Sequence, residues 1–109
     1  MVQATTMNVA IVIPVYNERE NLPALLDAIR LELKGKVEYT FVIADDGSTD
    51  GTKEWLKEEQ SKGNVFVVEN EHNAGPGKAF EAGFRYVISQ LPQSTNVLTL
   101  EGDGTADLG

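Results

Sequence analysis

Residues 39–52 read Tyr-Thr-Phe-Val-Ile-Ala-Asp-Asp-Gly-Ser-Thr-Asp-Gly-Thr, and this stretch decides the fold. Residues 39–44 are almost continuously apolar, which is typical of a strand that is buried on both faces in a parallel sheet. A helical pattern begins near Thr52. Two adjacent carboxylates, Asp45 and Asp46, therefore stand where a buried strand ends and a helix is about to begin. Ligands of open α/β sheets bind at that edge, outside the carboxyl ends of the strands, so the stretch predicts a ligand site.

The acidic loop also has simpler interpretations. Asp, Gly, Ser and Thr are ordinary turn residues, and Asp50 is a candidate N-cap of the following helix. A calcium-binding loop fits residues 46–51, but its twelfth position needs a bidentate Glu and holds Lys57. The predicted element before the loop is a strand, whereas an EF-hand needs a helix there. The turn interpretation stays open on these residues alone, and the calcium loop is excluded.

Composition limits the class of protein. The chain has 109 residues, 41% of them hydrophobic, which is enough for one globular domain. The formal net charge is −8 and no basic patch is present, so nucleic-acid binding is not expected. The chain has no cysteine, which excludes disulfides and thiolate metal sites. No apolar run approaches the roughly 18 residues of a membrane span, and residues 1–7 are expected to be a disordered lead-in rather than a signal peptide. We therefore expect a cytoplasmic location.

Further apolar runs and helical patterns complete the chain. Residues 8–14 predict a strand that Pro14 ends, because proline cannot donate to a central ladder. The helix after it has Asn17 or Asn21 as its candidate cap and Gly35 as its stop. The other predicted elements are a helix over 52–62, a strand over 65–68, a loop over 71–78, a helix that Pro92 ends, and a strand over 96–100.

The third predicted helix has one apolar face and several small residues. Helical spacing predicts burial of Phe80, Phe84, Val87 and Leu91. The small side chains, which would let this helix lie close to the sheet, belong to Ala79, Ala82 and Gly83.

Strands and helices thus alternate along the chain with short connections. This order predicts an α/β domain over residues 8–109, in which a parallel sheet carries helices on both faces in a three-layer, Rossmann-like arrangement.

Acidic residues gather at one edge of this predicted sheet. They are Glu18 after the first strand, Asp45 and Asp46 after the second, and Glu101 and Asp103 after the fourth. Carboxylates that converge in this way repel each other unless a cation or water separates them, and Mg²⁺ and Mn²⁺ prefer oxygen ligands and substrate phosphates. Lys78 opens the third helix, where backbone N–H groups and the helix dipole also favour an anion. The residues therefore predict a metal-bridged diphosphate ligand.

Four motifs in this order resemble a known family. They lie at residues 9–18, 45–52, 73–79 and 101–103, the last reading Glu-Gly-Asp. Together they resemble the nucleotide-sugar-binding half of family 2 glycosyltransferases of the GT-A fold. Within that family they are most similar to the polyprenyl-phosphate (dolichol-phosphate) mannosyl- and glucosyltransferases. The resemblance covers about residues 8–107.

The resemblance implies a binding site for a nucleoside diphosphate sugar. The loop after the first strand would hold the base and ribose, the acidic pair would meet the base, and the lysine would lie near the phosphates. The residues implied are Pro14, Tyr16, Glu18, Asp45 or Asp46, and Lys78.

The resemblance also implies a cofactor and a reaction. Glu101 and Asp103 match the Asp-x-Asp motif that binds Mn²⁺ or Mg²⁺ on the donor diphosphate, although the family usually has Asp where this chain has Glu101. The reaction implied is transfer of a sugar from a UDP- or GDP-linked donor to an acceptor such as a polyprenyl phosphate, with inversion.

The sequence stops shortly after the Glu-Gly-Asp motif. We therefore expect a donor-binding fragment with little transferase activity of its own, since the acceptor half of the family, its catalytic base and any membrane-associated segment would be absent. In a full-length protein, membrane contact at the cytoplasmic face would come through those segments. Self-association through the exposed edge of a halved sheet is a further expectation.

Two interpretations from other classes stay open. One is a receiver-like signalling module that binds Mg²⁺, although such a module has its acidic pair after the first strand and its Lys on a fifth strand. The other is a nucleotide-binding domain without catalytic activity.

Overall fold

The computed structural model describes residues 8–70, 75–91 and 96–99. The lead-in predicted for residues 1–7 lies outside these ranges, as do Glu101 and Asp103. The elements follow in the order β1 (Asn8–Val15), α1 (Leu22–Leu33), β2 (Glu38–Asp45), α2 (Thr52–Lys62), β3 (Val65–Glu69), α3 (Pro76–Gln90) and β4 (Asn96–Thr99).

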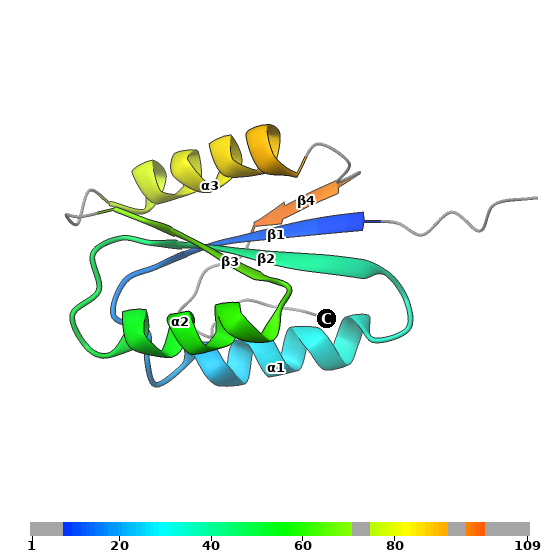
Figure 1. Cartoon of the computed structure of the whole chain (residues 1–109), viewed down its shortest axis with the longest axis horizontal. Coiled ribbons are helices and arrows are strands. Elements are labelled where there is room, and N and C mark those ends of the chain that lie inside the picture. The colour runs from blue at the N-terminus through cyan, green and yellow to red at the C-terminus, as the bar shows by residue number, and fades with distance from the viewer. Residues whose placement is uncertain (1–7, 71–74, 92–95, 100–109) are drawn as a thin grey trace, which may run out of the picture.

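The strands form one parallel sheet between two layers of helices. The strand order is β3-β2-β1-β4, and each neighbouring pair is parallel. Helix α3 covers one face of the sheet, and α1 and α2 cover the other (Figure 1). The predicted α/β class, with helices on both faces of a parallel sheet, is confirmed.

The strand order also locates a binding edge. The chain builds outward from β1 through β2 to β3 and then crosses to the other side of β1 to form β4. Ligands of open α/β sheets bind at such a switch point, at the carboxyl ends of the strands. A receiver-like module would place β3 beside β1, so that interpretation is wrong.

The core explains why the strands read as continuous apolar runs. Alternate residues of a strand face opposite sides of the sheet. Ile11, Ile13, Phe41 and Ile43 pack with Leu26 and Leu56 on the α1 and α2 side. Ala10, Val12 and Val42 pack with Val87 on the α3 side. Since both faces are covered, both sets of strand side chains are buried.

Strand β1 does not end at Pro14, as predicted, but continues to Val15. The carbonyl of Val15 accepts a hydrogen bond from the Asp46 backbone N–H (2.8 Å) on the β2 side. Since backbone groups alternate in direction along a strand, Pro14 turns toward the other side, where the described pairing with β4 runs from Val9 to Val12. The missing N–H of Pro14 therefore costs no ladder hydrogen bond among the described strands.

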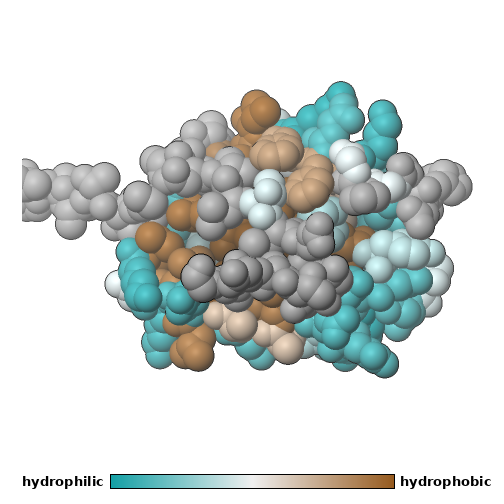
Figure 2. All heavy atoms as spheres, turned by 180° about the vertical axis from the view of Figure 1, so that it is seen from behind, coloured by the Kyte–Doolittle hydropathy of each residue, from teal (hydrophilic) through white to brown (hydrophobic). Residues whose placement is uncertain are grey.

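Helix α3 begins at Pro76, earlier than predicted, so the preceding loop is shorter. Ala79, Gly83 and Val87 are buried, but Phe84 is 38% exposed, so its predicted burial is wrong. The helix lies so close to β1 that a Cβ on Gly83 would come within 2.5 Å of Val12 Cγ1. Small residues therefore form the closest part of a contact face that also includes Val87. Other apolar side chains of the helix are exposed on its outside (Figure 2).

Candidate functional site

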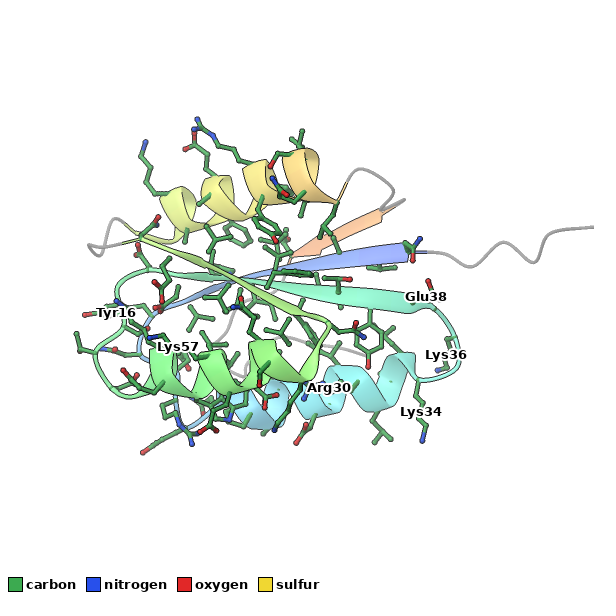
Figure 3. The ribbon with its side chains drawn as sticks, in the orientation of Figure 1. Tyr16, Arg30, Lys34, Lys36, Glu38 and Lys57 are labelled. Atoms are coloured by element: carbon green, nitrogen blue, oxygen red, sulfur yellow. The ribbon has the colours of Figure 1, made fainter. Side chains whose placement is uncertain are left out.

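The loops that follow β1 and β2 meet at the carboxyl edge of the sheet. Tyr16 lies at this edge, whereas Lys34, Lys36 and Glu38 lie at the opposite edge (Figure 3). The backbone N–H of Asp46 donates to Val15 O, and that of Asn70 donates to Asp45 O (2.9 Å). These bonds join the ends of three neighbouring strands, which gives the edge a fixed frame.

Asp45 is fully buried, and its two carboxylate oxygens have different surroundings. Oδ1 accepts hydrogen bonds from the backbone N–H (3.3 Å) and the hydroxyl of Ser48. Oδ2 is buried and has no hydrogen-bond donor among the described residues. Burial raises the pKa of the Asp45 carboxyl, and the hydrogen bonds from Ser48 only partly offset that rise. The edge therefore contains one buried acceptor that none of the described residues satisfies.

Asp46, although adjacent, is turned toward α3. Its Oδ2 accepts a hydrogen bond from the Gly75 backbone N–H (2.8 Å), and its Oδ1 accepts one from Asn70 Nδ2 (3.3 Å). Gly75 directly precedes α3, so this carboxylate ties the start of the helix to the end of β2. The two adjacent carboxylates therefore differ in their contacts. Asp46 ties the end of β2 to the start of α3, whereas Asp45 has an oxygen, Oδ2, that no described residue bonds.

A latch of hydrogen bonds joins the two loops of the site. The backbone N–H of Asn17 donates to Ser48 Oγ (2.9 Å), and the Asn17 side-chain Oδ1 accepts from the Thr49 backbone N–H (2.7 Å). Two residues further on, the Arg19 backbone N–H donates to Asp50 Oδ2 (3.1 Å). Asp50 Oδ1 also accepts from the Thr52 backbone N–H (3.1 Å) at the start of α2. The predicted N-cap position of Asp50 is wrong, because Gly51 is the N-cap of α2, and the Asp50 carboxylate instead joins the loop after β1 to the first residue of α2.

Asn17 adopts a left-handed backbone with φ of 54°. We expect Asn17→Ala to lower the free energy of unfolding by about 2 kcal/mol, since alanine loses the bond to Thr49 and tolerates this conformation poorly. Asn17→Gly loses the same bond but fits the backbone, so it should be about 1 kcal/mol more stable than the alanine variant. Urea denaturation measures both values, and equal losses would show that the backbone conformation is not the cause.

The other predicted residues lie at or near the same edge. Tyr16 is 44% exposed, and Pro14 is half-buried at the end of β1. Glu18 Oε2 accepts from Asn21 Nδ2 (3.1 Å), so Asn21 occupies the N-cap position of α1 without capping it through its side chain. Lys78 lies in the first turn of α3, with its side chain 70% exposed.

The predicted metal ligands cannot be placed in this way, because Glu101 and Asp103 lie outside the described residues. Within the described ranges, no group of three or more His, Cys, Asp or Glu side chains could hold a metal ion. The carboxylates of Asp45 and Asp46 therefore do not form such a site with their described neighbours.

Sequence reasoning missed the roles of Ser48 and Asn17. Both lie inside the motifs that carry the family resemblance, so a signal for their importance was present. The motifs do not show which carboxylate oxygen accepts the hydrogen bond from the serine hydroxyl, because that depends on how two loops distant in sequence fold together.

Comparison with known proteins agrees with the predicted family. The family model described as glycosyl transferase family 2 matches residues 10–106. An undecaprenyl-phosphate 4-deoxy-4-formamido-L-arabinose transferase of Serratia proteamaculans is 39% identical over 98 residues, covering 87% of this chain and 28% of the relative. A dolichyl-phosphate beta-glucosyltransferase of Trichomonas vaginalis is 35% identical over 106 residues, covering 91% of this chain and 31% of the relative.

Solved structures of similar fold lead to the same family. TarS of S. aureus in complex with UDP superposes with a TM-score of 0.69 at 29% identity, covering 89% of this chain and 28% of TarS. The chain thus spans less than a third of the length of these proteins. Its strands and helices form the predicted GT-A fold, and the chain belongs to glycosyl transferase family 2.

Proposed function

We propose that the chain binds the nucleoside diphosphate of a sugar donor at the carboxyl edge of the sheet, with Asp45 Oδ2 accepting an N–H of the base. The observation that carries this proposal is the buried Oδ2, which has no donor among the described residues. An unsatisfied buried acceptor costs about 1–3 kcal/mol, and a base N–H would relieve that cost. The structure of TarS in complex with UDP supports a nucleotide as the ligand of this fold.

The neighbouring residues suit the rest of a nucleotide. The exposed ring of Tyr16 can stack on the base, and Glu18 on the same loop and Pro14 at the end of β1 lie near it for contacts with the ribose. Lys78 and the N-terminus of α3 favour the negatively charged phosphates. Asp46 contributes indirectly, because it holds Gly75 at the start of that helix.

A divalent cation is part of the proposal. The carboxylates of Glu101 and Asp103 are oxygen donors of the kind that Mn²⁺ and Mg²⁺ prefer, so the donor set fits the ion. When bound, the ion would offset the negative charge of the diphosphate leaving group.

We extend the proposal to the whole reaction. The sugar would pass from a UDP- or GDP-linked donor to a polyprenyl phosphate, with inversion at the sugar carbon. The relatives of this chain include an undecaprenyl-phosphate and a dolichyl-phosphate transferase, which supports that acceptor class. None of the helices in the described ranges has the length and apolarity needed to cross a bilayer. The cytoplasmic location and self-association stay predictions, and sedimentation at high concentration tests the latter.

Thermal unfolding with UDP or GDP, each with and without Mn²⁺, tests the proposal. A ligand at about 100 times its dissociation constant should add about 2.7 kcal/mol of stability. Asp45→Asn should abolish this gain, because its amide can present a donor to the base N–H. The ligand-free variant should be at least as stable as the wild type, since burial raises the Asp45 pKa and so disfavours the charged carboxylate.

A matched variant controls for the loss of charge. Asp27 lies exposed on α1, so Asp27→Asn should keep the full gain from the nucleotide. An Asp45→Asn chain that UDP or GDP stabilises as strongly as the wild type would contradict the proposed role of Asp45.

A further inference from the structure

A pocket of about 260 Å³ lies between α2 and β3, on the face of the sheet that α1 and α2 cover. The described residues that line this α2–β3 pocket are Lys53, Lys57, Gln60, Val67 and Glu69. Its volume is just below the roughly 300 Å³ at which small-molecule sites in proteins begin. The pocket therefore suits a small ligand rather than a whole nucleotide.

Two lysines of the pocket lie one helical turn apart on α2. Lys53 is half-buried and Lys57 is exposed, and Figure 3 shows Lys57 between α2 and the strands. Neither forms an ion pair with a carboxylate in the part of the chain that the structure describes, whereas Lys62 and Lys78 each pair with a glutamate of their own helix. The positive charges of Lys53 and Lys57 are therefore available to a ligand.

Neutral N–H groups add to these charged donors. Gln60 Oε1 accepts the backbone N–H of Val67 (2.9 Å), which holds the side-chain amide against β3 and leaves its NH₂ group to donate to a ligand. Backbone groups alternate in direction along a strand, so the N–H of Glu69 turns to the same side as that of Val67, away from β2. The pocket thus combines two ammonium groups with amide donors.

The charges of the lining residues indicate which ligand fits. Two lysines stand against the carboxylate of Glu69, which leaves the described lining with a formal charge of +1 in a chain of net charge −8. A phosphate monoester carries a charge of about −1.5 to −2 at pH 7 and three acceptor oxygens. Lysine binds phosphate as a point charge. A carboxylate ligand has a single charge and gains less from the two ammonium groups, although Glu69 repels it too.

We propose that the α2–β3 pocket binds a phosphate monoester group, with the ammonium groups of Lys53 and Lys57 and the side-chain NH₂ of Gln60 as donors. The ester belongs either to a small soluble molecule or to a lipid head group. This inference goes beyond the proposed function and does not rest on it, because none of the lining residues belongs to the proposed donor site.

Titration of the full chain with glycerol 3-phosphate at constant ionic strength, followed by N–H chemical shifts, tests the inference. The backbone signals of Lys53 and Lys57 and the side-chain signal of Gln60 should shift and saturate. Residues 34–38 are an internal control, because they also hold two lysines and a glutamate but lie at the opposite edge of the sheet (Figure 3). Shifts of equal size in that segment would show general ion screening and would overturn the inference.

Single substitutions then test the two ammonium groups. Lys53→Gln and Lys57→Gln should each weaken the binding of glycerol 3-phosphate by roughly tenfold or more, since each loses a charged donor. Lys36→Gln removes the same charge outside the pocket and should leave the affinity unchanged. An unchanged affinity in Lys57→Gln would overturn the inference, and this exposed position answers the question even if Lys53→Gln does not fold.

A competition arm separates this pocket from the donor site. The affinity for glycerol 3-phosphate should persist with UDP and Mn²⁺ at saturation. If UDP displaces the ester, and the ester shifts Ser48 and Gly75 rather than Lys53 and Lys57, the phosphate occupies the donor site and the inference is wrong. A chain that binds the ester but no nucleotide would overturn the proposed function alone.

A vesicle arm distinguishes the two sources of the ester. Phosphatidic acid is a lipid with a phosphate monoester head group, and vesicles of phosphatidylcholine with and without it are the probes. Sedimentation of the wild type, but not of Lys57→Gln, with the phosphatidic acid vesicles would identify a lipid head group. Binding of glycerol 3-phosphate without sedimentation would identify a soluble ester. A chain that binds neither probe would overturn the inference.

Discussion

Replacing Arg30 by alanine should lower the free energy of unfolding by about 2–3 kcal/mol. Arg30 Nη2 donates to Glu59 Oε1 (3.0 Å), and Glu59 is buried on the face of α2 that meets α1. The Arg30 guanidinium also lies 5.5 Å from the centre of the Phe41 ring. The loss should be smaller than for a fully buried ion pair, because Lys62 still donates to Glu59 (2.9 Å) and Arg30 is partly exposed.

The same ion pair predicts a pH dependence. Burial raises the pKa of Glu59, but hydrogen bonds from Lys62 and Arg30 outweigh it and hold that pKa below its usual value. A carboxyl whose pKa is lower in the folded state stabilises the fold above its unfolded pKa, about 4.3, and loses this contribution as the pH falls through its folded pKa. The stability difference between the wild type and Glu59→Gln should therefore be largest near pH 7 and shrink below about pH 4.3.

Urea denaturation between pH 7 and pH 3 measures this difference. Glu58→Gln is the matched control, because Glu58 neighbours Glu59 but is exposed. A gap between the wild type and Glu59→Gln that stays constant down to pH 3 would contradict the role assigned to the ion pair.

Two glycine-to-alanine changes on α3 should have effects of opposite sign. A Cβ on Gly83 would lie 2.5 Å from Val12 Cγ1, and Val12 is fully buried in the sheet. Gly83→Ala should therefore cost about 1–3 kcal/mol, in spite of the helix preference of alanine. A Cβ on Gly77 would meet nothing within 4 Å, so Gly77→Ala should gain up to about 1 kcal/mol.

A double-mutant cycle with Val12→Ala identifies the cause of the loss at position 83. Shortening the valine removes the atom that the new Cβ would strike, so Gly83→Ala should cost less in the Val12→Ala background. If Gly83→Ala were as stable as Gly77→Ala, the close approach of α3 to β1 would be in error.

Apolar patterning was sufficient to predict the layers of the fold. The run over 39–44 is continuous because β2 is covered by α1 and α2 on one face and by α3 on the other. The same logic placed Asp45 and Asp46 at the carboxyl edge. The predicted loop residues Tyr16 and Glu18 also follow β1 at this edge, since all strands are parallel.

Side-chain partners across distant loops could not be predicted in the same way. Asp45 and Asp46 are neighbours in sequence, yet one bonds to Ser48 and the other to Gly75. Phe84 follows Phe80 by one helical turn, yet Phe80 packs against the core between α3 and the sheet whereas Phe84 is 38% exposed. These outcomes depend on how closely helices and loops approach one another in space. The periodicity of apolar residues along the sequence carries no information on that distance.

The most direct test of the account is a map of backbone amide chemical shifts as UDP and Mn²⁺ are added to the chain. Changes should gather at the carboxyl edge, at Asn17, Ser48 and Gly75. The amides of Lys34, Lys36 and Glu38, at the opposite edge of the sheet, should stay unchanged (Figure 3). Changes centred on that opposite edge, or no change in any amide at saturating UDP, would contradict the assignment of the carboxyl edge as the donor site.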